Sequence, residues 1–545
     1  ILFLLYLALA IGQQCNALQP PTGLVCRSGD QSVVLHWNKS TEPGVRGYNV
    51  YRSSSNGCPG ILLNKKALLT SPGYCDVGPG TVNGLTNYYQ VAAIGGPSSQ
   101  SEPSDAIAAV PHAFADNNEF LDYLQQVSFD YFWYLANPAN GLIPDRSAPG
   151  SACSIAAVGF GLTSIAIGID HGWISRAEGA SRVLATLKTF LHGPQGPGAS
   201  GMIGYKGWFY HFLNMNTAVR ANGELSSIDT ALLVAGILDS KQYFDRDVPD
   251  EAAIRKIADT IFARLDWSWM SRGSSMLSMG WLPGSGFIKS NWLGYNEAMI
   301  LLCLGLGTPT NSLPSSAWEA WTKGYTWKSY YGQSYVPFAP LFGYQYSHCW
   351  IDFRDSADAF MNAHNLTYFE NSRRASLAQR SYCIANPLKH AGYDGLLWGL
   401  TACDGPPGYS AHGAPPPQDD DGTIAPTAAG GSIAFTPEYS IPTLRHIYDL
   451  YRPQMWTAYG FRDALNMDAR WFGPDELGID QGPIVIMIEN YRTERVWRRF
   501  MKNEVIQRGL QRAGFVPVNF RMATPKLKLP NDSDKDPTVR AVRPR

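Results

Sequence analysis

The pattern of apolar and polar positions divides the chain into two regions of different texture. Between residues 18 and 112, short runs alternate apolar and polar residues and are separated by turn-rich stretches such as residues 40–44. Strict alternation is typical of strands that bury one face. The clearest runs cover residues 32–37, 48–52 and 87–94. Their spacing predicts a small antiparallel β-sandwich of about 100 residues.

From residue 119 the apolar positions follow a helical period. The segments with apolar faces are 119–134, 154–168, 177–191, 228–243, 251–270, 297–306 and 356–369. Residues 298–304 are apolar all round, so we expect a helix that is buried on every side. Strands do not alternate with helices, which disfavours a doubly wound sheet or a β/α barrel. We therefore expect an all-α domain over residues 119–515, with its helices in two layers arranged as a double ring of hairpins.

Long connections rich in Gly, Pro, Trp and Tyr separate these helices. They cover residues 201–217, 280–296, 325–346 and 405–426. Loops of this length inside a compact domain are usually functional. We expect the chemistry of the protein to lie there and at the helix starts that follow.

The remaining segments predict export, a linker and a tail. Residues 1–17 hold a short apolar run and end at Ala17, a small residue, which is typical of a secretory signal peptide, here an incomplete one. The run is too short for a stable membrane span. We expect a secreted or periplasmic protein, a linker at residues 113–118, and a polar, disordered tail at 516–545.

Composition narrows the class of protein further. The chain has 545 residues, which predicts more than one domain, and a formal net charge of −1, which gives no field that attracts nucleic acid or an anionic membrane. No phosphate-binding loop or dinucleotide motif is present, and no cofactor is expected. Aromatic residues make up 12%, including 16 Trp and 28 Tyr, and their flat apolar faces with polar edges suit sugar rings.

Nine cysteines are scattered without the paired spacing of a zinc cluster, so we expect no metal site. Because an exported chain permits disulfides, Cys58 and Cys75 are the expected pair, and Cys26 is an alternative partner for either.

Several carboxylates stand beside aromatic residues at helix starts or in loops. Hydrolysis of a glycosidic bond needs one carboxylic acid to protonate the leaving oxygen and one carboxylate to activate water or attack carbon. Aromatic walls favour the acid, since they raise its pKa by desolvation. Glu297 precedes a wholly apolar helix, where a carboxylate is costly unless it is used or paired. Glu224 and Asp229 equally fit helix caps.

Two further residues keep alternative interpretations. Asp352 equally fits an ion pair with Arg354. His348 is either a hydrogen-bond donor to a substrate or a histidine of the core.

Six ordered motifs in residues 119–515 resemble the bacterial glucoamylase-like domain family, which includes secreted endo-β-1,2-glucanases. The motifs are residues 224–233, 294–300, 345–354, 398–402, 421–428 and 478–492. The resemblance implies an (α/α)6 toroid and inverting hydrolysis of β-1,2-glucan, with Glu297 as general acid and Asp480 as the base that acts on water. It implies sugar binding by Glu224, Asp229, Tyr295, Tyr346, His348, Trp350, Asp352 and Asp421.

Residues 18–112 resemble a fibronectin type III module. The resemblance rests on an opening Pro20-Pro21, on Trp37 at the core position and on Tyr88 in a tyrosine corner. Such modules are spacers or adhesive units.

The leading hypothesis is thus an endo-acting β-glucanase that works as a monomer. The alternatives are an exo-acting hydrolase or a glucosyltransferase on the same scaffold, and a non-catalytic glycan-binding protein. Separation of the two catalytic carboxyls by roughly 6.5–9.5 Å is expected for direct inversion, against about 5–5.5 Å for retention.

Overall fold

The computed structural model describes residues 18–58, 60–96 and 99–519, which form two compact units that divide after Ala113. The expected signal peptide and residues 520–545 of the expected tail lie outside the described residues. The division falls at the start of the expected linker, but the helical unit begins earlier than residue 119, because Asp116 already caps its first helix by accepting the N–H groups of Asn118 and Glu119.

The N-terminal unit, the β domain, consists of two antiparallel sheets. One has the order β1-β2-β5; the other has the order β4-β3-β6-β7, with β8 also paired to β6. The strands are β1 (Val25–Gly29), β2 (Ser32–His36), β3 (Gly47–Ser53), β4 (Ile61–Leu62), β5 (Gly73–Asp76), β6 (Asn87–Gly96), β7 (Ser99–Gln100) and β8 (Ile107–Ala109). The three strands predicted from alternation are confirmed.

The core of the β domain joins its two sheets. Val33 and Leu35 of β2 and Val50 of β3 belong to one buried cluster, so the inner faces of the two sheets contact each other. Trp37 and Tyr48 meet edge to face within it, with ring centroids 5.2 Å apart. Burial of these apolar and aromatic side chains supplies the hydrophobic stabilisation of the unit.

The expected disulfide between Cys58 and Cys75 is wrong. Cys58 is a free thiol, as are Cys26 and the five cysteines of the helical domain. Cys75 lies on β5, while Cys58 is exposed on the turn that follows β3, and no bond joins them.

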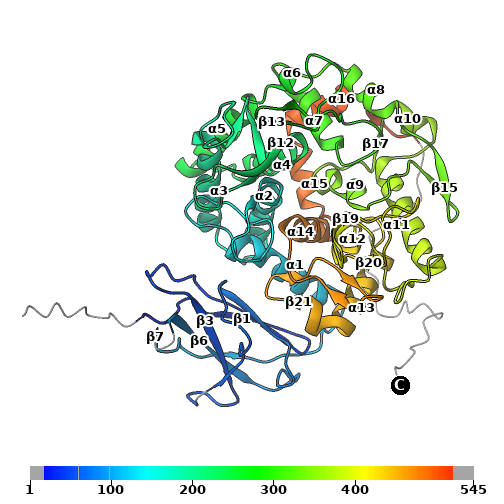
Figure 1. The fold of residues 1–545 in the computed structure, drawn as a ribbon. Helices are drawn as coiled ribbons and strands as arrows, with labels where there is room; N and C mark the ends of the chain where they lie inside the picture. Colours follow the sequence, from blue (N-terminus) through cyan, green and yellow to red (C-terminus); the bar gives the residue numbers. More distant parts are fainter. Residues whose placement is uncertain (1–17, 59, 97–98, 520–545) are drawn as a thin grey trace, which may run out of the picture. The chain divides into compact units, whose positions relative to one another are not determined.

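The second unit, the helical domain, has an inner and an outer set of helices. The inner set is almost entirely buried and consists of α2 (Ile155–Asp170), α4 (Ser227–Tyr243), α7 (Met299–Gly307), α9 (Phe342–Gln345), α12 (Pro426–Gly430) and α14 (Gly478–Thr493). Figure 1 shows α2, α4, α12 and α14 towards the middle of this domain. Their apolar sequences require this position, because no face is polar enough to meet water.

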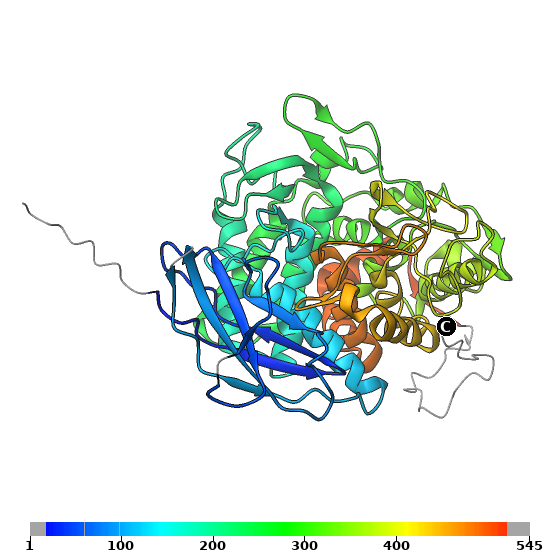
Figure 2. The same cartoon turned by 60° about the horizontal axis from the view of Figure 1, so that its bottom comes forward.

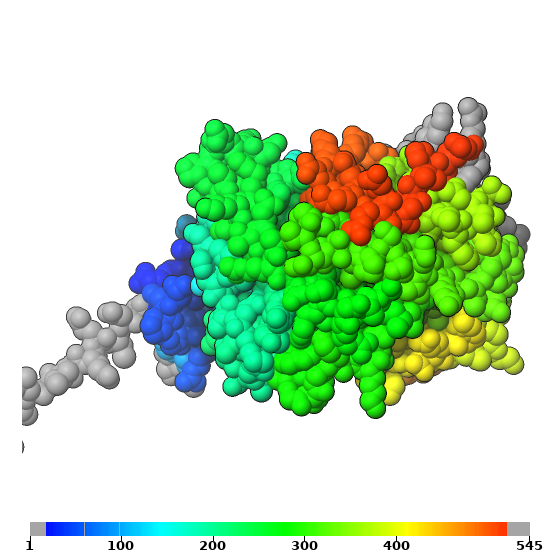
Figure 3. Space-filling model, turned by 90° about the horizontal axis from the view of Figure 1, so that it is seen from above, coloured from blue at the N-terminus to red at the C-terminus, as the bar shows by residue number. Residues whose placement is uncertain are grey.

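Helices with one polar face cover the inner set. They are α1 (Asn117–Tyr134), α3 (Arg176–His192), α5 (Pro249–Ala263), α8 (Ser316–Thr322), α11 (Tyr368–Ala385), α13 (Pro437–Met455), α15 (Arg495–Phe500) and α16 (Glu504–Arg512). Pairs of outer and inner helices pack together, such as α1 with α14 and α16 with α7. Figure 3 shows residues of α16, in red, on the surface beside the green segment that contains α7 and α8. Two short helices, α6 (Trp267–Met270) and α10 (Ala359–Ala363), complete the described helices.

Two glycines allow the inner helices to approach closely. A Cβ atom on Gly159 of α2 would clash with the backbone oxygen of Leu232 of α4, and a Cβ on Gly236 of α4 would clash with the backbone oxygen of Gly159. The backbones therefore touch where these helices cross, which only glycine permits. This contact fixes the start of α4 relative to α2.

The helix predictions hold for α1 to α4 and fail at two later segments. The prediction of one helix over residues 356–369 is wrong: strand β17 (Ser356–Ala357), α10 and the first turn of α11 share it. Asp358 caps α10, Asn365 has a φ of 51° that interrupts the helical path, and Thr367 caps α11. Residues 251–270 likewise divide into α5 and α6.

The long connections contain short strands that the sequence analysis did not predict. The first two connections contribute to one sheet of β9 (Cys153–Ser154), β10 (Gly204–Tyr205), β11 (Trp208–Leu213), β12 (Arg220–Ser226), β13 (Gly280–Leu282) and β14 (Gly286–Phe287). Figure 2 shows its green part, which includes β13 and β14, projecting beyond the helices.

The other connections form hairpins and short pairs. These strands are β15 (Lys328–Tyr330), β16 (Gln333–Tyr335), β18 (Ala402–Gly405), β19 (Gly408–Ala411), β20 (Thr423–Ile424), β21 (Trp456–Thr457), β22 (Gly460–Phe461), β23 (Leu465–Asn466) and β24 (Trp471–Phe472). Strand β25 (Val516–Pro517) pairs with β17, so the expected tail begins with an ordered strand. Among the described residues, no helix combines the length and apolar character that a bilayer span requires.

Candidate active site

A cavity of about 450 Å³ opens where the inner helices of the helical domain begin. Acidic, basic and aromatic side chains share its wall, which gives it both charge and flat apolar surface. Its lining residues are Asp145, Arg146, His211, Phe212, Ile228, Asp229, Leu232, Glu297, Phe342, Tyr346, Ala402, Tyr409, Leu477 and Ile479. We call this cavity the central pocket.

Helix starts and strand ends position the polar residues of the central pocket. Asp229 lies in the first turn of α4, whose N-cap is Ser226. The Ser226 hydroxyl accepts the N–H of Asp229 at 3.2 Å and donates to the carboxylate of the same residue. A side chain that is locked to its own helix cap in this way keeps one orientation.

Glu297 lies immediately before the buried helix α7, in the wall of the pocket. Ser347 holds this turn by donating its hydroxyl to the backbone oxygen of Glu297 at 2.9 Å. Burial first, and then the nearby charge of Asp229, raise the pKa of the Glu297 carboxyl to about 7. A carboxyl that remains protonated close to neutral pH can act as a general acid.

Asp480 lies in the first turn of α14, next to the pocket residue Ile479. Its carboxyl is buried, and its Oδ2 has no hydrogen-bond partner among the described residues. Burial first, and then the charge of Asp463, raise the pKa of Asp480 well above the ordinary range. Asp480 itself is not among the residues that line the pocket.

Tyr346 connects the two carboxyls that the sequence singled out. It lines the central pocket, and its pKa is raised first by burial and then by neighbouring groups that include Asp480 and Glu297. The phenol therefore lies within electrostatic range of both carboxyls. Glu297 and Asp480, far apart in the chain at the starts of α7 and α14, therefore both influence one aromatic residue of the pocket wall.

His211, on β11, joins two further carboxylates. Its Nδ1 lies 3.2 Å from Oε1 of Glu224, and its Nε2 lies 3.6 Å from Oδ1 of Asp229. Burial alone would lower the pKa of this imidazole, but Asp229 and Glu224 outweigh it and raise the pKa to about 9. His211 is therefore a cation at neutral pH, held between two anions.

The same three side chains are the group of possible metal ligands that the described residues offer. One ligand atom from each of His211, Glu224 and Asp229 lies within 4.8 Å of the others. A metal requires the neutral imidazole, whereas the two carboxylates favour the protonated one. A proton and a divalent cation would thus compete for His211.

Of the predicted site residues, Asp229, Glu297 and Tyr346 line the central pocket, Glu224 is bound to its wall through His211, and Asp480 adjoins it. His348 and Trp350 do not line it, and both are fully buried. Nε2 of His348 is 3.1 Å from the Ser372 hydroxyl, and burial lowers its pKa to about 3. Trp350 donates to Thr163 at 2.9 Å. The expected sugar contacts of these two side chains are corrected: their place is the core.

Three other predicted binding residues also lie outside the lining of the central pocket. Tyr295 is buried among Tyr344, Tyr368 and other rings. Asp352 forms the predicted ion pair with Arg354, at 2.7 Å. Asp421 lies 3.1 Å from Nε2 of His412. Sugar contacts by these three remain predictions.

The structure adds Asp145, Arg146, His211 and Tyr409 to the site. Arg146 pairs with Asp404 at 2.9 Å and with Asp475 at 3.4 Å, which ties three connections together at the pocket wall. Tyr409 is on the β18–β19 hairpin and is 69% exposed, so its ring is available at the rim. Tyr409 lies within a connection that the sequence marked as functional, while Asp145 and Arg146 carried no such signal.

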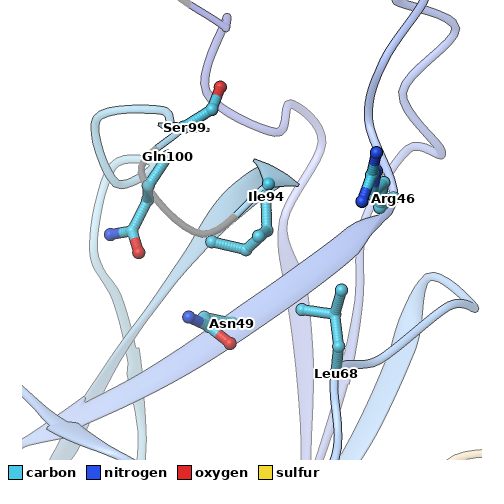
Figure 4. Close-up of a pocket in the computed structure, with 7 residues that line it drawn as sticks. Arg46, Asn49, Leu68, Ile94, Ser99 and Gln100 are labelled. Atoms are coloured by element: carbon cyan, nitrogen blue, oxygen red, sulfur yellow. The ribbon is translucent and has the colours of Figure 1, made fainter.

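A second cavity, of about 660 Å³, lies on the β domain (Figure 4). Figure 4 shows Asn49 and Gln100 with Leu68, Ile94 and Arg46 around it. The residues that line it include no carboxylate, so it lacks the acid–base pair that hydrolysis needs. The central pocket is therefore the candidate active site.

Comparison with known proteins points to one group. A family model named Glycoamylase, which describes glucoamylases, matches residues 289–504. An exo β-1,2-glucooligosaccharide sophorohydrolase (non-reducing end) of Parabacteroides distasonis is 30% identical over 535 residues, covering 91% of this chain and 71% of that protein.

Two solved structures resemble the model. The crystal structure of a β-1,2-glucanase from Parabacteroides distasonis has a TM-score of 0.80 and 28% identity, and the match covers 92% of this chain and 73% of that one. An endo-β-1,2-glucanase from Chitinophaga pinensis, in complex with sophorotriose and glucose, has a TM-score of 0.68 and 29% identity, with coverage of 74% and 99%.

Proposed function

The chain belongs to the glucoamylase-like family of glycoside hydrolases, and we propose that it cleaves the β-1,2 linkages of a glucan by an inverting two-carboxylate mechanism. Its relatives with known activity act on β-1,2-linked glucose chains. The central pocket offers the aromatic and acidic side chains that such a substrate needs.

One observation carries this proposal: Glu297 and Asp480 both lie within electrostatic range of Tyr346, in the wall of the central pocket, and both raise its pKa. Glu297, kept protonated by burial, donates its proton to the leaving glycosidic oxygen. Asp480 accepts a proton from the water that attacks the anomeric carbon from the opposite face. The bond between carbon and the leaving oxygen breaks as the bond from carbon to water forms, and the configuration inverts.

The remaining pocket residues bind and orient the sugar. Asp229, fixed by its helix cap, and Glu224 with His211 supply acceptors and a donor for hydroxyl groups. Tyr346 and Tyr409 supply apolar faces on which a ring can stack.

The helical domain is proposed to be an (α/α)6 toroid. The inner helices α2, α4, α7, α9, α12 and α14 alternate along the chain with outer ones, and α2 packs against both α4 and α14. A ring closed in this way brings the inner helix starts to one end, which is where the central pocket opens.

Exo action is the second candidate. The ion pairs of Arg146 with Asp404 and Asp475 tie connections together beside the pocket, and this arrangement would close one end of a cleft. An exo enzyme releases one short product from the start of the reaction, whereas an endo enzyme first shortens the polymer into a ladder. Chromatography of early products on a linear β-1,2-glucan separates the two.

The other expectations stand as parts of the proposal. The β domain, with its two sheets and its core Trp37, is proposed to be a fibronectin type III-like spacer. Export and action as a monomer rest on the sequence alone. Cell fractionation and gel filtration test them.

The test of the function is the release of reducing ends from β-1,2-, β-1,3- and α-1,4-glucans. We expect release from the β-1,2-glucan alone, together with a first product whose anomeric configuration, followed by NMR, is opposite to that of the cleaved bond. Preference for another linkage would overturn the substrate, and retention would overturn the mechanism.

A further inference from the structure

Asp480 has a partner that neither the sequence analysis nor the pocket lining identified. Asp463 lies between β22 and β23, and its backbone N–H donates to the backbone oxygen of Asp475 at 2.9 Å. Its carboxyl is buried and lies within interaction range of the buried carboxyl of Asp480. An ionised carboxylate only accepts hydrogen bonds, so a hydrogen bond between these two side chains would require a proton on one of them.

The surroundings leave the shared proton in place. Oδ2 of Asp463 accepts the backbone N–H of Asp404 at 2.7 Å. Oδ1 of Asp463 and Oδ2 of Asp480 are buried and have no hydrogen-bond partner among the described residues. They are therefore the atoms available to share a proton.

The charges around the pair are mostly negative. Arg146 is the cation that acts on Asp463, and it is already paired with Asp404 and Asp475. The other titratable groups within electrostatic range of Asp463 or Asp480 carry no positive charge; they are Asp145, Cys403, Tyr131, Tyr346 and Tyr409. Two buried like charges side by side are strongly unfavourable, and one retained proton removes the conflict.

We propose that Asp463 and Asp480 share one proton near neutral pH and act as a unit, in which Asp463 takes up the proton of Asp480 as Asp480 accepts one from the attacking water. This inference rests on the proposed function and deepens it. Asp463 does not touch the sugar; it is a positioning residue that acts through Asp480.

The protons balance through one turnover. The pair starts with one proton and a charge of −1. The attacking water gives its oxygen to the anomeric carbon and one proton to Asp480, whose own proton passes to Asp463, so the pair ends neutral. Glu297 loses its proton to the leaving oxygen and becomes charged. Solvent then removes one proton from the pair and returns one to Glu297.

Infrared difference spectroscopy tests the shared proton without any substrate. At about pH 8, where most of Glu297 is ionised, the spectrum of the wild type minus that of Asp463→Asn should show the carbonyl band of a protonated buried carboxyl. The same band should appear against Asp480→Asn. Asp449→Asn, which removes an exposed carboxylate paired with Arg445, should leave the spectrum unchanged. Absence of the band from the wild type would overturn the inference, even if the glucanase activity is confirmed.

Kinetics of the single and double variants test whether the pair acts as a unit. Each of Asp463→Asn and Asp480→Asn should lower kcat about 10²- to 10⁴-fold with little change in KM. The double variant should lose no more than the worse single variant, because groups that act together are not additive. If the two single losses in kcat multiply in the double variant, the two carboxyls do not act as a unit. A kcat of Asp463→Asn within twofold of the wild-type value would also reject the proposal. Melting temperatures confirm that each variant is folded; if Asp463→Asn fails to fold, the Asp480→Asn spectrum still decides.

Discussion

The imidazole of His211, on β11, lies 3.2 Å from the carboxylate of Glu224, on the neighbouring strand β12. Asp229 lies on the other side of the ring. Removing the cation leaves two carboxylates without their shared partner. We expect His211→Gln to raise KM and to lower the melting temperature, because the two carboxylates then repel each other without the cation between them.

The contribution of the His211 ion pairs to the stability of the protein should depend on pH. The folded pKa of His211 is about 9, above its ordinary value of 6.5. Its contribution is therefore complete below about pH 6.5 and is lost as the pH rises towards 9. The difference in melting temperature between wild type and His211→Gln should shrink over this range in calorimetry. A constant difference would show that the charge of His211 is not the cause.

Tyr409 offers an exposed aromatic face at the rim of the central pocket. If a glucose ring stacks on it, Tyr409→Ala should raise KM roughly 3- to 10-fold with little effect on kcat. Tyr331 is also exposed, at the turn of the β15–β16 hairpin, but does not line the pocket, so Tyr331→Ala is the matched control. Equal effects of the two substitutions on KM would remove Tyr409 from the binding site.

A buried network away from the pocket predicts how acid destabilises the helical domain. Glu489 of α14 accepts hydrogen bonds from Gln125 and Thr493 and lies 2.7 Å from His171. Burial would raise its pKa, but His171 and Thr493 outweigh this and lower the pKa to about 2. The resulting stabilisation is present above about pH 4.5 and is lost as the pH falls towards 2.

Glu489→Gln should therefore lower the free energy of unfolding at pH 7 by about 3 kcal/mol, and by much less at pH 3. Urea denaturation at the two pH values measures both. The half-buried Glu494, paired with Arg354 and Arg498, supplies the control Glu494→Gln, for which a smaller effect is expected.

The sequence predicted the parts of the fold that have one strong period. Helices α1 to α4 and the strands β2, β3 and β6 follow the expected segments within a few residues. The prediction of one helix over 356–369 was wrong, because it followed the apolar spacing alone. Asp358 and Thr367 each cap a separate helix and divide the segment. The short strands in the connections bury few residues each and leave no alternation to detect.

The candidate site was predictable in part. Glu297, Asp229 and Tyr346 belong to motifs that the family resemblance marked, and they line one pocket. The same motifs also contain His348 and Trp350, which pack in the core. A motif of this kind includes residues that hold a helix in place as well as residues that face the pocket. Asp463 and Arg146 could not be found in this way, since their roles depend on which connections meet in space.

The central claim is that Glu297 is the proton donor of a β-1,2-glucan hydrolase, and Glu297→Gln tests it most directly. Because its folded pKa of about 7 exceeds the ordinary 4.5, ionising Glu297 costs stability at higher pH, and the amide should not lower the melting temperature at pH 8. We expect Glu297→Gln to lower kcat about 10²- to 10⁴-fold on β-1,2-glucan, with oligosaccharide binding retained in calorimetry. A folded Glu297→Gln enzyme that cleaves the glucan at the wild-type rate would contradict it.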